Sequence, residues 1–406
     1  MTKNRNLLRI FLLFCFLVPL RLSALTLKEC VNLAVSNNPA LLLYREDIKI
    51  SEFRVNQAKA LMKPRMSLGA YYDYYNLGYP SIFSSSIGAF NLRPDSEELY
   101  GTRITLDQPL YTGGKNKTIK KQASHNLLST QAQYLTEKNR IIYEVERKFI
   151  EVFYLKKMSA VISSAETSIA KADPGSLETE IGMQMEKEKI NLDMELNKTL
   201  HELNSLVSAE FIESAQVADA LVPDPTVLDG NLTKLILIAQ QNRPELKGLK
   251  ARESIDSLSV ELGKSFKFPN VDFFSKYDYL HAIEDEWSSN FQVGVSLTFP
   301  LYDGGVRWSQ YRERNALFQK TKILISSEEE RIKSQVEQAY KGLEFSRKIF
   351  GLAQKRKDSF SIPSKSGVQD IKKWKEVMMD YLAAERDMLV ASAFLKFSTG
   401  SEIPKY

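Results

Sequence analysis

Cysteine and histidine are scarce in this 406-residue chain, which contains two cysteines and three histidines. Cys15 lies in a segment that we expect to be removed, so Cys30 would be alone and no disulfide could form within the mature chain. His125, His201 and His281 are isolated and have no metal-ligand spacing around them. The motifs Gly-x-Ser-x-Gly, His-Glu-x-x-His and Cys-x-x-Cys are absent. We therefore predict no catalytic residue, no metal site, no cofactor and no enzyme activity.

Long apolar runs are also lacking, with one exception near the N-terminus. Residues 7–20 are mostly apolar, with Lys3, Arg5 and Arg9 before or at their start, and they lead to a small residue at Ala24. This pattern is typical of a secretory signal peptide cleaved after Ala24. The alternative is a short membrane anchor, although the run is shorter than the ~20 residues of a spanning helix. Beyond it no uninterrupted apolar stretch reaches about 18 residues, so any membrane insertion of the mature chain would have to use strands.

Neither sign of charge dominates the sequence. The chain contains 55 basic and 50 acidic residues, a net charge of +5. Because the predicted signal holds four of the bases and no acid, the mature chain carries only about +1. Such a balance gives no electrostatic basis for binding nucleic acid.

An internal repeat organises the rest of the chain. Leu41 and Leu246 follow similar Asn-x-Pro-x segments at an offset of 205 residues. Further on, Pro-Leu-Tyr-Thr-Gly-Gly beginning at Pro109 matches Pro-Leu-Tyr-Asp-Gly-Gly beginning at Pro300, now at an offset of 191. The first copy therefore has extra residues, which fall in residues 76–99, a stretch rich in Ser, Gly, Pro and Asn. This composition predicts a loop.

Each copy predicts the same order of elements: a short helix, a longer helix, two strands, a very long helix and a returning helix. The expected helices are 27–36, 40–62, 115–171 and 177–207 in the first copy and 232–241, 245–266, 306–358 and 370–397 in the second. A helix of 57 residues would be roughly 85 Å long, a length that is normally stabilised by coiled-coil packing. The predicted division is a signal peptide over 1–24, a first repeat over 25–223 and a second over 224–406. The β-hairpins are expected at 65–108 and 270–299, and the helical hairpins at 115–207 and 306–397.

The expected strands alternate between apolar and polar residues. Met66, Leu68 and Ala70 alternate with Ser67 and Gly69, and the other three strands show the same pattern over about 10 residues. Strands of this kind suit a membrane barrel with lipid outside and water inside, but a soluble sheet with one wet face shows the same alternation. Four strands cannot close a membrane barrel, since the smallest have ~8. If the strands insert, several chains must share one barrel.

With this repeat and these strands, the sequence resembles the TolC family of outer membrane factors. The resemblance rests on Leu-Thr-Leu-Lys-Glu-Cys-Val-Asn-Leu-Ala-Val-Ser-Asn-Asn-Pro beginning at Leu25, on the two Pro-Leu-Tyr-x-Gly-Gly motifs, and on Phe-Ser-Thr-Gly ending at Gly400. It covers nearly all of the mature chain. The resemblance implies an α+β membrane protein that forms a homotrimer, with a twelve-stranded outer-membrane β-barrel continuous with a long α-helical coiled-coil tunnel in the periplasm.

The same resemblance implies function and partners. Channels of this family serve tripartite efflux pumps or type I secretion systems, and they work with a periplasmic adaptor (membrane fusion) protein and an inner-membrane transporter. No nucleic acid partner is expected. The alternative from another class is a soluble periplasmic coiled-coil adaptor or structural protein. The sequence does not identify the exported substrate, because drugs, metals, peptides and proteins leave through similar channels.

Two prolines and four glycines mark the expected strand-to-helix junctions. Proline cannot donate to a sheet ladder, so Pro109 and Pro300 are predicted to end strands. The paired glycines allow unusual dihedral angles where strand becomes helix; they are Gly113, Gly114, Gly304 and Gly305. A phosphate-binding interpretation of these glycines is weak, because the lysine-serine pattern of a P-loop is missing.

The helical ends carry the remaining predictions. By resemblance, the turns containing Pro174, Gly175, Ser366 and Gly367 would contact the adaptor. Asp370 is the candidate for a charged ring at the pore entrance, because three copies around a threefold axis would focus the field on passing ions. Lys372 and Lys373 could reverse the local sign, and Lys373 lies close enough along a helix to pair with Asp370. The alternative is that Asp370 caps a helix or is a solvated surface charge.

Overall fold

The computed structural model describes residues 26–74, 81–85, 88–92, 98–172, 180–208, 231–283, 286–360 and 367–400. The predicted signal peptide lies outside these residues, as do Pro174, Gly175 and Ser366. The described part is mostly helical, with one four-stranded antiparallel sheet and one two-stranded sheet.

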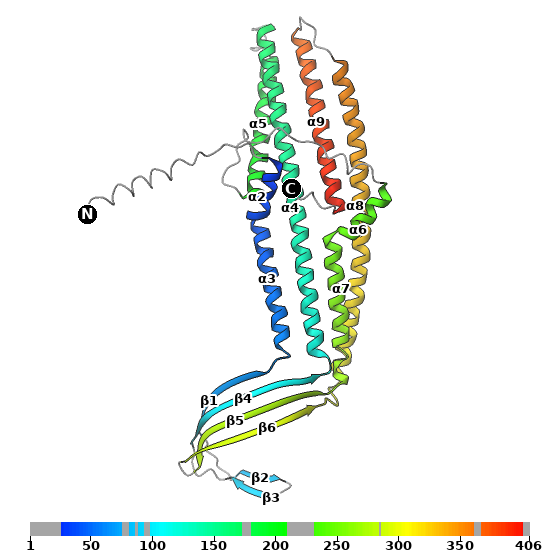
Figure 1. Cartoon of the computed structure of the whole chain (residues 1–406). Coiled ribbons are helices and arrows are strands. Elements are labelled where there is room, and N and C mark those ends of the chain that lie inside the picture. The colour runs from blue at the N-terminus through cyan, green and yellow to red at the C-terminus, as the bar shows by residue number, and fades with distance from the viewer. Residues whose placement is uncertain are drawn as a thin grey trace, which may run out of the picture. The chain divides into compact units, whose positions relative to one another are not determined.

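Both halves of the chain share one order of elements, apart from two short strands in the first half and a short 3-10 helix in the second (Figure 1). The first half contains α2 (Leu27–Asn37), α3 (Pro39–Ala60), β1 (Arg65–Tyr74), β2 (Ser81–Ser85), β3 (Gly88–Leu92), β4 (Glu98–Thr112), α4 (Lys115–Ala172) and α5 (Glu180–Val207). The second contains α6 (Leu232–Asn242), α7 (Pro244–Leu262), the short 3-10 helix η4 (Ser265–Lys267), β5 (Asn270–Ile283), β6 (Glu286–Thr298), α8 (Val306–Ser359) and α9 (Val368–Thr399). Each predicted helix is present, with ends within a few residues of those expected.

The predicted loop over 76–99 is wrong in part. Residues 81–85 and 88–92 form the antiparallel pair β2 and β3, with Phe83 opposite Phe90 in the register. Ile82, Phe83 and Phe90 have high strand propensity, which short runs between Ser, Gly and Asn concealed when composition was averaged over the whole segment.

The chain divides into two compact units that do not follow the predicted repeats. The first unit comprises Met1–Arg45, Tyr134–Pro244 and Glu329–Tyr406, and the second comprises Glu46–Gln133 and Glu245–Glu328. Each unit therefore draws on both halves of the sequence.

The core of the first unit lies among α2, the start of α3, α4, α5 and α9. Its fully buried side chains include Cys30, Leu41, Phe149 and Leu203. Burial raises the pKa of the Cys30 thiol to about 11. Helix α2 begins with a capping box, in which the Thr26 hydroxyl accepts from the Glu29 amide and the Glu29 carboxylate accepts from the Thr26 amide.

The second unit holds the four-stranded sheet, in the order β1-β4-β5-β6 (Figure 1). Every neighbouring pair is antiparallel, so β4 and β5 join the two predicted hairpins into one sheet. The strands contain 10, 15, 14 and 13 residues. Three of them are thus longer than the roughly 10 residues expected for a tilted membrane strand.

Polar side chains join the helices of the second unit. The Gln122 amide on α4 donates to the Ser259 hydroxyl on α7 at 2.7 Å, and the Arg314 guanidinium on α8 donates to the Ser259 carbonyl at 3.3 Å. The hydroxyl of Ser51 on α3 lies 3.1 Å from that of Thr130 on α4, and both residues are buried. These pairs satisfy polar groups between packed helices and help to fix how each helix is positioned along its neighbour.

Candidate functional site

The register of the four-stranded sheet sorts its side chains into two faces. One row across the strands is apolar and solvent-exposed: Leu68, Ile104, Tyr277 and Phe291. The adjacent row, one residue along each strand, is small or polar: Gly69, Arg103, Asp278 and Asn290. Because the side chains of each strand alternate between the faces, the sheet has one apolar and one polar side. An exposed apolar face of this extent marks a surface for contact with lipid or protein.

Aromatic rings gather on the apolar side, near the strand ends furthest from the helices. Tyr100 stacks on His281 with ring centroids 4.8 Å apart, and Tyr279 stacks on Trp287 at the same distance. Tyr100 also meets the edge of Trp287 at 5.5 Å. Tyrosine and tryptophan are enriched at membrane–water interfaces, where an amphipathic ring is half wet and half dry.

The polar side is held by cross-strand polar contacts. Arg103 on β4 forms an ion pair with Asp278 on β5, and its guanidinium lies 5.3 Å from the centre of the Tyr71 ring on β1. The hydroxyls of Ser67 and Thr105 are hydrogen-bonded at 2.7 Å. Opposite charges and hydroxyl pairs directly across strands stabilise a sheet by a few tenths to about 1 kcal/mol each.

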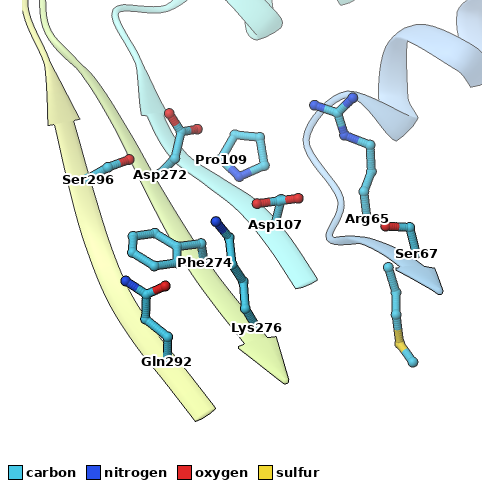
Figure 2. A pocket seen from close by; sticks show the side chains of 10 residues that line it. Arg65, Ser67, Asp107, Pro109, Asp272, Phe274, Lys276, Gln292 and Ser296 are labelled. Atoms are coloured by element: carbon cyan, nitrogen blue, oxygen red, sulfur yellow. The ribbon is translucent and has the colours of Figure 1, made fainter. Parts of the chain in front are cut away.

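A hollow on this polar side is open to solvent, and Figure 2 shows the side chains that line it. The lining carries both signs of charge and several hydrogen-bonding groups: Arg65, Met66, Ser67, Asp107, Pro109, Asp272, Phe274, Lys276, Gln292 and Ser296. Two bases and two acids face the same space, so the surface favours water and charged solutes without a strong preference for either sign.

Each glycine pair stands directly before a long helix and after a strand. Gly113 and Gly114 have φ angles of +58° and +81°, and Gly304 and Gly305 have +67° and +87°. Residues with a side chain rarely adopt this left-handed region, so glycine is the residue that the turn favours.

A matching hydrogen bond follows each glycine pair. The backbone amide of Asn116 donates to the Thr112 hydroxyl at 3.3 Å, and the backbone amide of Arg307 donates to the Asp303 carboxylate at 3.1 Å. These donors and acceptors stand 191 residues apart, the offset of the repeated motif. Each acceptor satisfies an amide in the first turn of a long helix.

The prediction that Pro109 ends a strand is wrong. Strand β4 continues through Pro109 to Thr112, and the register with β5 shifts between Pro109 and Tyr111. The missing amide is accommodated by this irregularity in the ladder, which is one of the few places where a sheet tolerates proline. Pro300 does follow the end of β6 at Thr298.

Asp370 lies in the first turn of α9, and its carboxylate accepts the Gly367 amide at 3.3 Å. The carboxylate therefore acts as a helix cap in the single chain. In the described part of the chain no ion pair joins Lys373 to Asp370. Asp370, Lys372, Lys373 and Gly367 belong to the first unit, whereas the prolines and glycines of the junctions belong to the second. The predicted residues thus form two separate sites.

An ion pair near the entrance candidates, between a buried lysine and a partly exposed glutamate, was not predicted. The Lys375 ammonium on α9 binds the Glu188 carboxylate on α5 at 2.5 Å, and the Lys375 side chain is only 8% exposed. Ile371, four residues earlier on α9, and Met185, three residues before Glu188 on α5, belong to an apolar cluster of the helical hairpins. In the sequence, Lys375 belongs to a Lys-Lys-Trp-Lys run that is indistinguishable from a solvated helix face.

The helices of the described ranges include none with both the length and the apolar character needed to cross a membrane. Within the same ranges, His, Cys, Asp and Glu side chains do not come together in groups of three or more that could hold a metal ion.

No protein-family model and no curated protein sequence matches this chain. Several solved structures match the chain in fold. The chain matches the outer-membrane channel MtrE of Neisseria gonorrhoeae with a TM-score of 0.72 at 11% identity, over 92% of this chain and 88% of that one. The Campylobacter jejuni CmeC outer-membrane channel matches with a TM-score of 0.69 at 12% identity, over 92% and 85%. The outer-membrane protein VceC of Vibrio cholerae matches at 0.67 and 13%, over 92% and 96%.

The chain has the fold of outer-membrane channel proteins. This confirms the fold class predicted from the resemblance to the TolC family, with long helices attached to a small antiparallel sheet. The shared fold covers both units, since the matches span nearly the whole chain. The closed barrel of several chains stays a prediction.

Proposed function

We propose that this chain is the outer-membrane channel subunit of a tripartite efflux or type I secretion system. It would serve as a passive exit duct driven by an inner-membrane transporter, and it would perform no chemistry itself. The observation that carries the proposal is the two-sided sheet, whose apolar row at Leu68 and Phe291 is exposed while the polar side carries an open hollow with charged lining residues. Lipid would cover the first side and water would fill the second.

Several chains are needed to build the duct. Strands β1 and β6 are the edges of the sheet, and an open edge in lipid would leave backbone groups without hydrogen-bond partners. Three copies would give twelve strands and no edge. The helices support the same assembly, because α8 exposes Phe345, Ile349 and Leu352 at the i, i+4, i+7 spacing of a coiled-coil seam. A neighbouring copy would bury this stripe.

The remaining parts of the proposal rest on the resemblance to the TolC family. The chain would be exported through its N-terminal signal, span the outer membrane with its strands and place its helices in the periplasm. The ends of the helical hairpins, including Gly367, would meet the periplasmic adaptor. Asp370 would line the entrance, with Lys372 and Lys373 near it.

The alternative, a soluble periplasmic adaptor, is disfavoured by the sheet. A soluble protein rarely leaves a contiguous apolar face open to water, and here Met66, Val295 and Leu297 are 74%, 61% and 67% exposed. If this chain were a soluble adaptor, it would need a further element to cover the apolar face of the sheet.

Cell fractionation and planar-bilayer recording test the proposal together. The chain should stay with the outer membrane after a high-salt wash and should migrate as a heat-modifiable trimer. The purified trimer should open conducting pores in a lipid bilayer. Release of the chain into the soluble fraction, or a folded monomer in mild detergent, would contradict the proposal.

A further inference from the structure

Basic residues are concentrated where the sheet meets the helices. Residues 59–65, 112–121, 261–267 and 300–314 hold 12 Lys or Arg and 3 Asp or Glu, whereas the whole chain is nearly balanced. We call these four segments the junction collar. Of its bases, Lys115, Lys117, Lys264 and Lys267 are exposed. Within the described residues, Arg307 alone among the collar bases has a carboxylate at ion-pair distance, that of Asp303 at 3.1 Å.

Aromatic side chains lie close to two of these bases. The Lys267 ammonium lies 5.7 Å from the Trp308 ring centre, and the Lys264 ammonium lies 5.8 Å from that of Tyr311. Trp308 is 53% exposed, and Tyr302 nearby is 90% exposed. Cationic and aromatic side chains together are typical of a surface that meets lipid headgroups.

The collar contains a hollow of about 260 Å³ in which three bases converge. Lys115 comes from the start of α4, and Arg307 and Arg314 come from the start of α8. The other lining residues offer hydroxyl, amide or apolar groups and no carboxylate: Thr112, Leu262, Gly263, Ser265, Phe266, Phe268, Asn270, Pro300 and Gln310. Asp303, which pairs with Arg307, does not line the hollow, so the guanidinium and ammonium groups that face this space are suited to a phosphate, which arginine can bind through two hydrogen bonds.

We propose that this hollow, lined by Lys115, Arg307 and Arg314, binds the phosphate headgroup of an anionic phospholipid. The inference rests on the proposed function, which places the collar at the periplasmic surface of the outer membrane. There the apolar face of the sheet ends and lipid headgroups begin. The charge of the hollow complements an anionic headgroup, and a base that meets such a headgroup contributes about 1 kcal/mol of attraction, which is roughly a fivefold change in affinity. The exposed rings would pack on the adjoining glycerol and acyl chains.

Trp308 provides the measurement. The chain has three tryptophans, so replacing Trp287 and Trp374 by Phe leaves Trp308 as the single emitter. The full-length trimer is titrated in detergent with phosphatidylglycerol or phosphatidylcholine carrying bromine atoms, which quench a neighbouring indole. Phosphatidylglycerol should quench Trp308 with at least about tenfold higher affinity than phosphatidylcholine, since its headgroup alone carries a net charge that the bases can attract.

Substitution of two neighbouring lysines distinguishes binding in the hollow from a general effect of positive charge. Lys115→Gln should weaken phosphatidylglycerol binding about fivefold. Lys117→Gln removes an equally exposed charge on the same helical turn, but Lys117 does not line the hollow, so its effect should stay below about twofold. Arg314→Gln is the second test of the hollow. Equal effects of Lys115→Gln and Lys117→Gln would overturn the site.

Further arms identify the source of the phosphate and separate this inference from the proposed function. Competition by inorganic phosphate at the concentration of the lipid would mean that the hollow takes a free anion, which overturns the lipid assignment. Conductance is recorded on the same trimers. Conducting trimers without preference for phosphatidylglycerol would overturn this inference alone, whereas trimers that neither insert nor conduct would overturn the proposed function.

Discussion

Asn38 and Arg243, which stand 205 residues apart, each bind the carbonyl end of the last helix in their own half of the chain. The side-chain amide of Asn38 donates to the Leu206 carbonyl, at the end of α5, over 2.9 Å. The Arg243 guanidinium donates to the Phe397 carbonyl at the end of α9 at 3.2 Å. The final carbonyls of a helix lack partners within it and carry partial negative charge, so an amide and a cation both satisfy them. The two halves thus use different chemistry for one purpose.

This relationship predicts unequal losses of stability. Arg243 is 2% exposed and also donates to the Gln335 side chain at 2.7 Å, so its removal strands several buried acceptors. Arg243→Ala should lower the free energy of unfolding by about 3 kcal/mol, and Asn38→Ala by about 1 kcal/mol. Urea denaturation of the helical signal measures both. Arg243→Lys keeps the charge but lacks the several N–H donors of the guanidinium, so its free energy of unfolding should lie between those of the wild type and Arg243→Ala. A larger loss from Asn38→Ala would contradict this account.

The glycines of the two junctions provide a matched pair. Gly113 and Gly304 are equivalent and have similar φ angles, +58° and +67°. A Cβ atom at Gly113 would lie 2.8 Å from the Cβ of Phe268, whereas one at Gly304 would meet nothing within 4 Å. Gly304→Ala should cost about 1–2 kcal/mol from backbone strain, and Gly113→Ala should cost more because it adds a steric clash. Thermal denaturation of the purified variants gives the order, and equal losses would mean that the clash is unimportant.

Glu146 on α4 predicts a pH dependence. Burial raises the pKa of the Glu146 carboxyl, although the positive charge of Lys396 opposes the shift. A raised pKa in the folded state favours folding below the unfolded pKa, and this contribution is lost as the pH rises through the folded pKa. Glu146→Gln should therefore stabilise the protein more at pH 8 than at pH 4. Denaturation midpoints at the two pH values measure the difference, with the exposed Glu376→Gln as the control. Equal effects at both values would contradict the burial argument.

The two faces of the sheet predict opposite outcomes for one substitution. Phe291 is on the apolar face and its neighbour Asn290 is on the polar face. A lysine facing lipid costs about 2–4 kcal/mol near the bilayer centre, whereas one facing the lumen stays in water. Phe291→Lys should reduce the yield of outer-membrane trimer, and Asn290→Lys should leave the yield unchanged while shifting ion selectivity toward anions. Similar yields for both variants would argue against a lipid-facing sheet.

The cap at Asp370 refines the test of the pore entrance. Asp370→Ala would remove both a charge and the acceptor for the Gly367 amide, so its effect could not be assigned. Asp370→Asn keeps an oxygen acceptor and removes only the charge. If Asp370 lines the entrance, this variant should conduct with reduced preference for cations and with normal trimer yield. Bilayer recordings with unchanged selectivity would leave Asp370 as a helix cap alone.

The sequence predicted most of the helices because their signals are local. Helix α8 was expected from 306 to 358 and ends at Ser359, since a proline-free run with regular apolar spacing is readable within one segment. Strand β4 was predicted less well, because its passage through Pro109 depends on how β5 pairs with it. Pairing between strand residues 158 to 181 positions apart is a property of the folded chain, and no local pattern encodes it.

The buried polar contacts were missed for a similar reason. Arg243 and Lys375 look like ordinary surface charges in the sequence, and only the fold reveals that helix ends or carboxylates meet them. Their partners, Phe397 and Glu188, lie 154 and 187 residues away along the chain. The candidate entrance at Asp370 could be named from a resemblance, but its capping role required the position of the Gly367 amide.

The seclusion of Cys30 makes the described chain a natural template for site-specific labelling. Its side chain is fully buried, and because its pKa is raised to about 11 the reactive thiolate is rare at neutral pH. A cysteine introduced on either face of the sheet would thus be the readily modified thiol of the folded protein. Maleimide dyes could report on individual positions without first removing a native cysteine, and modification of Cys30 itself would signal that the helical core had opened.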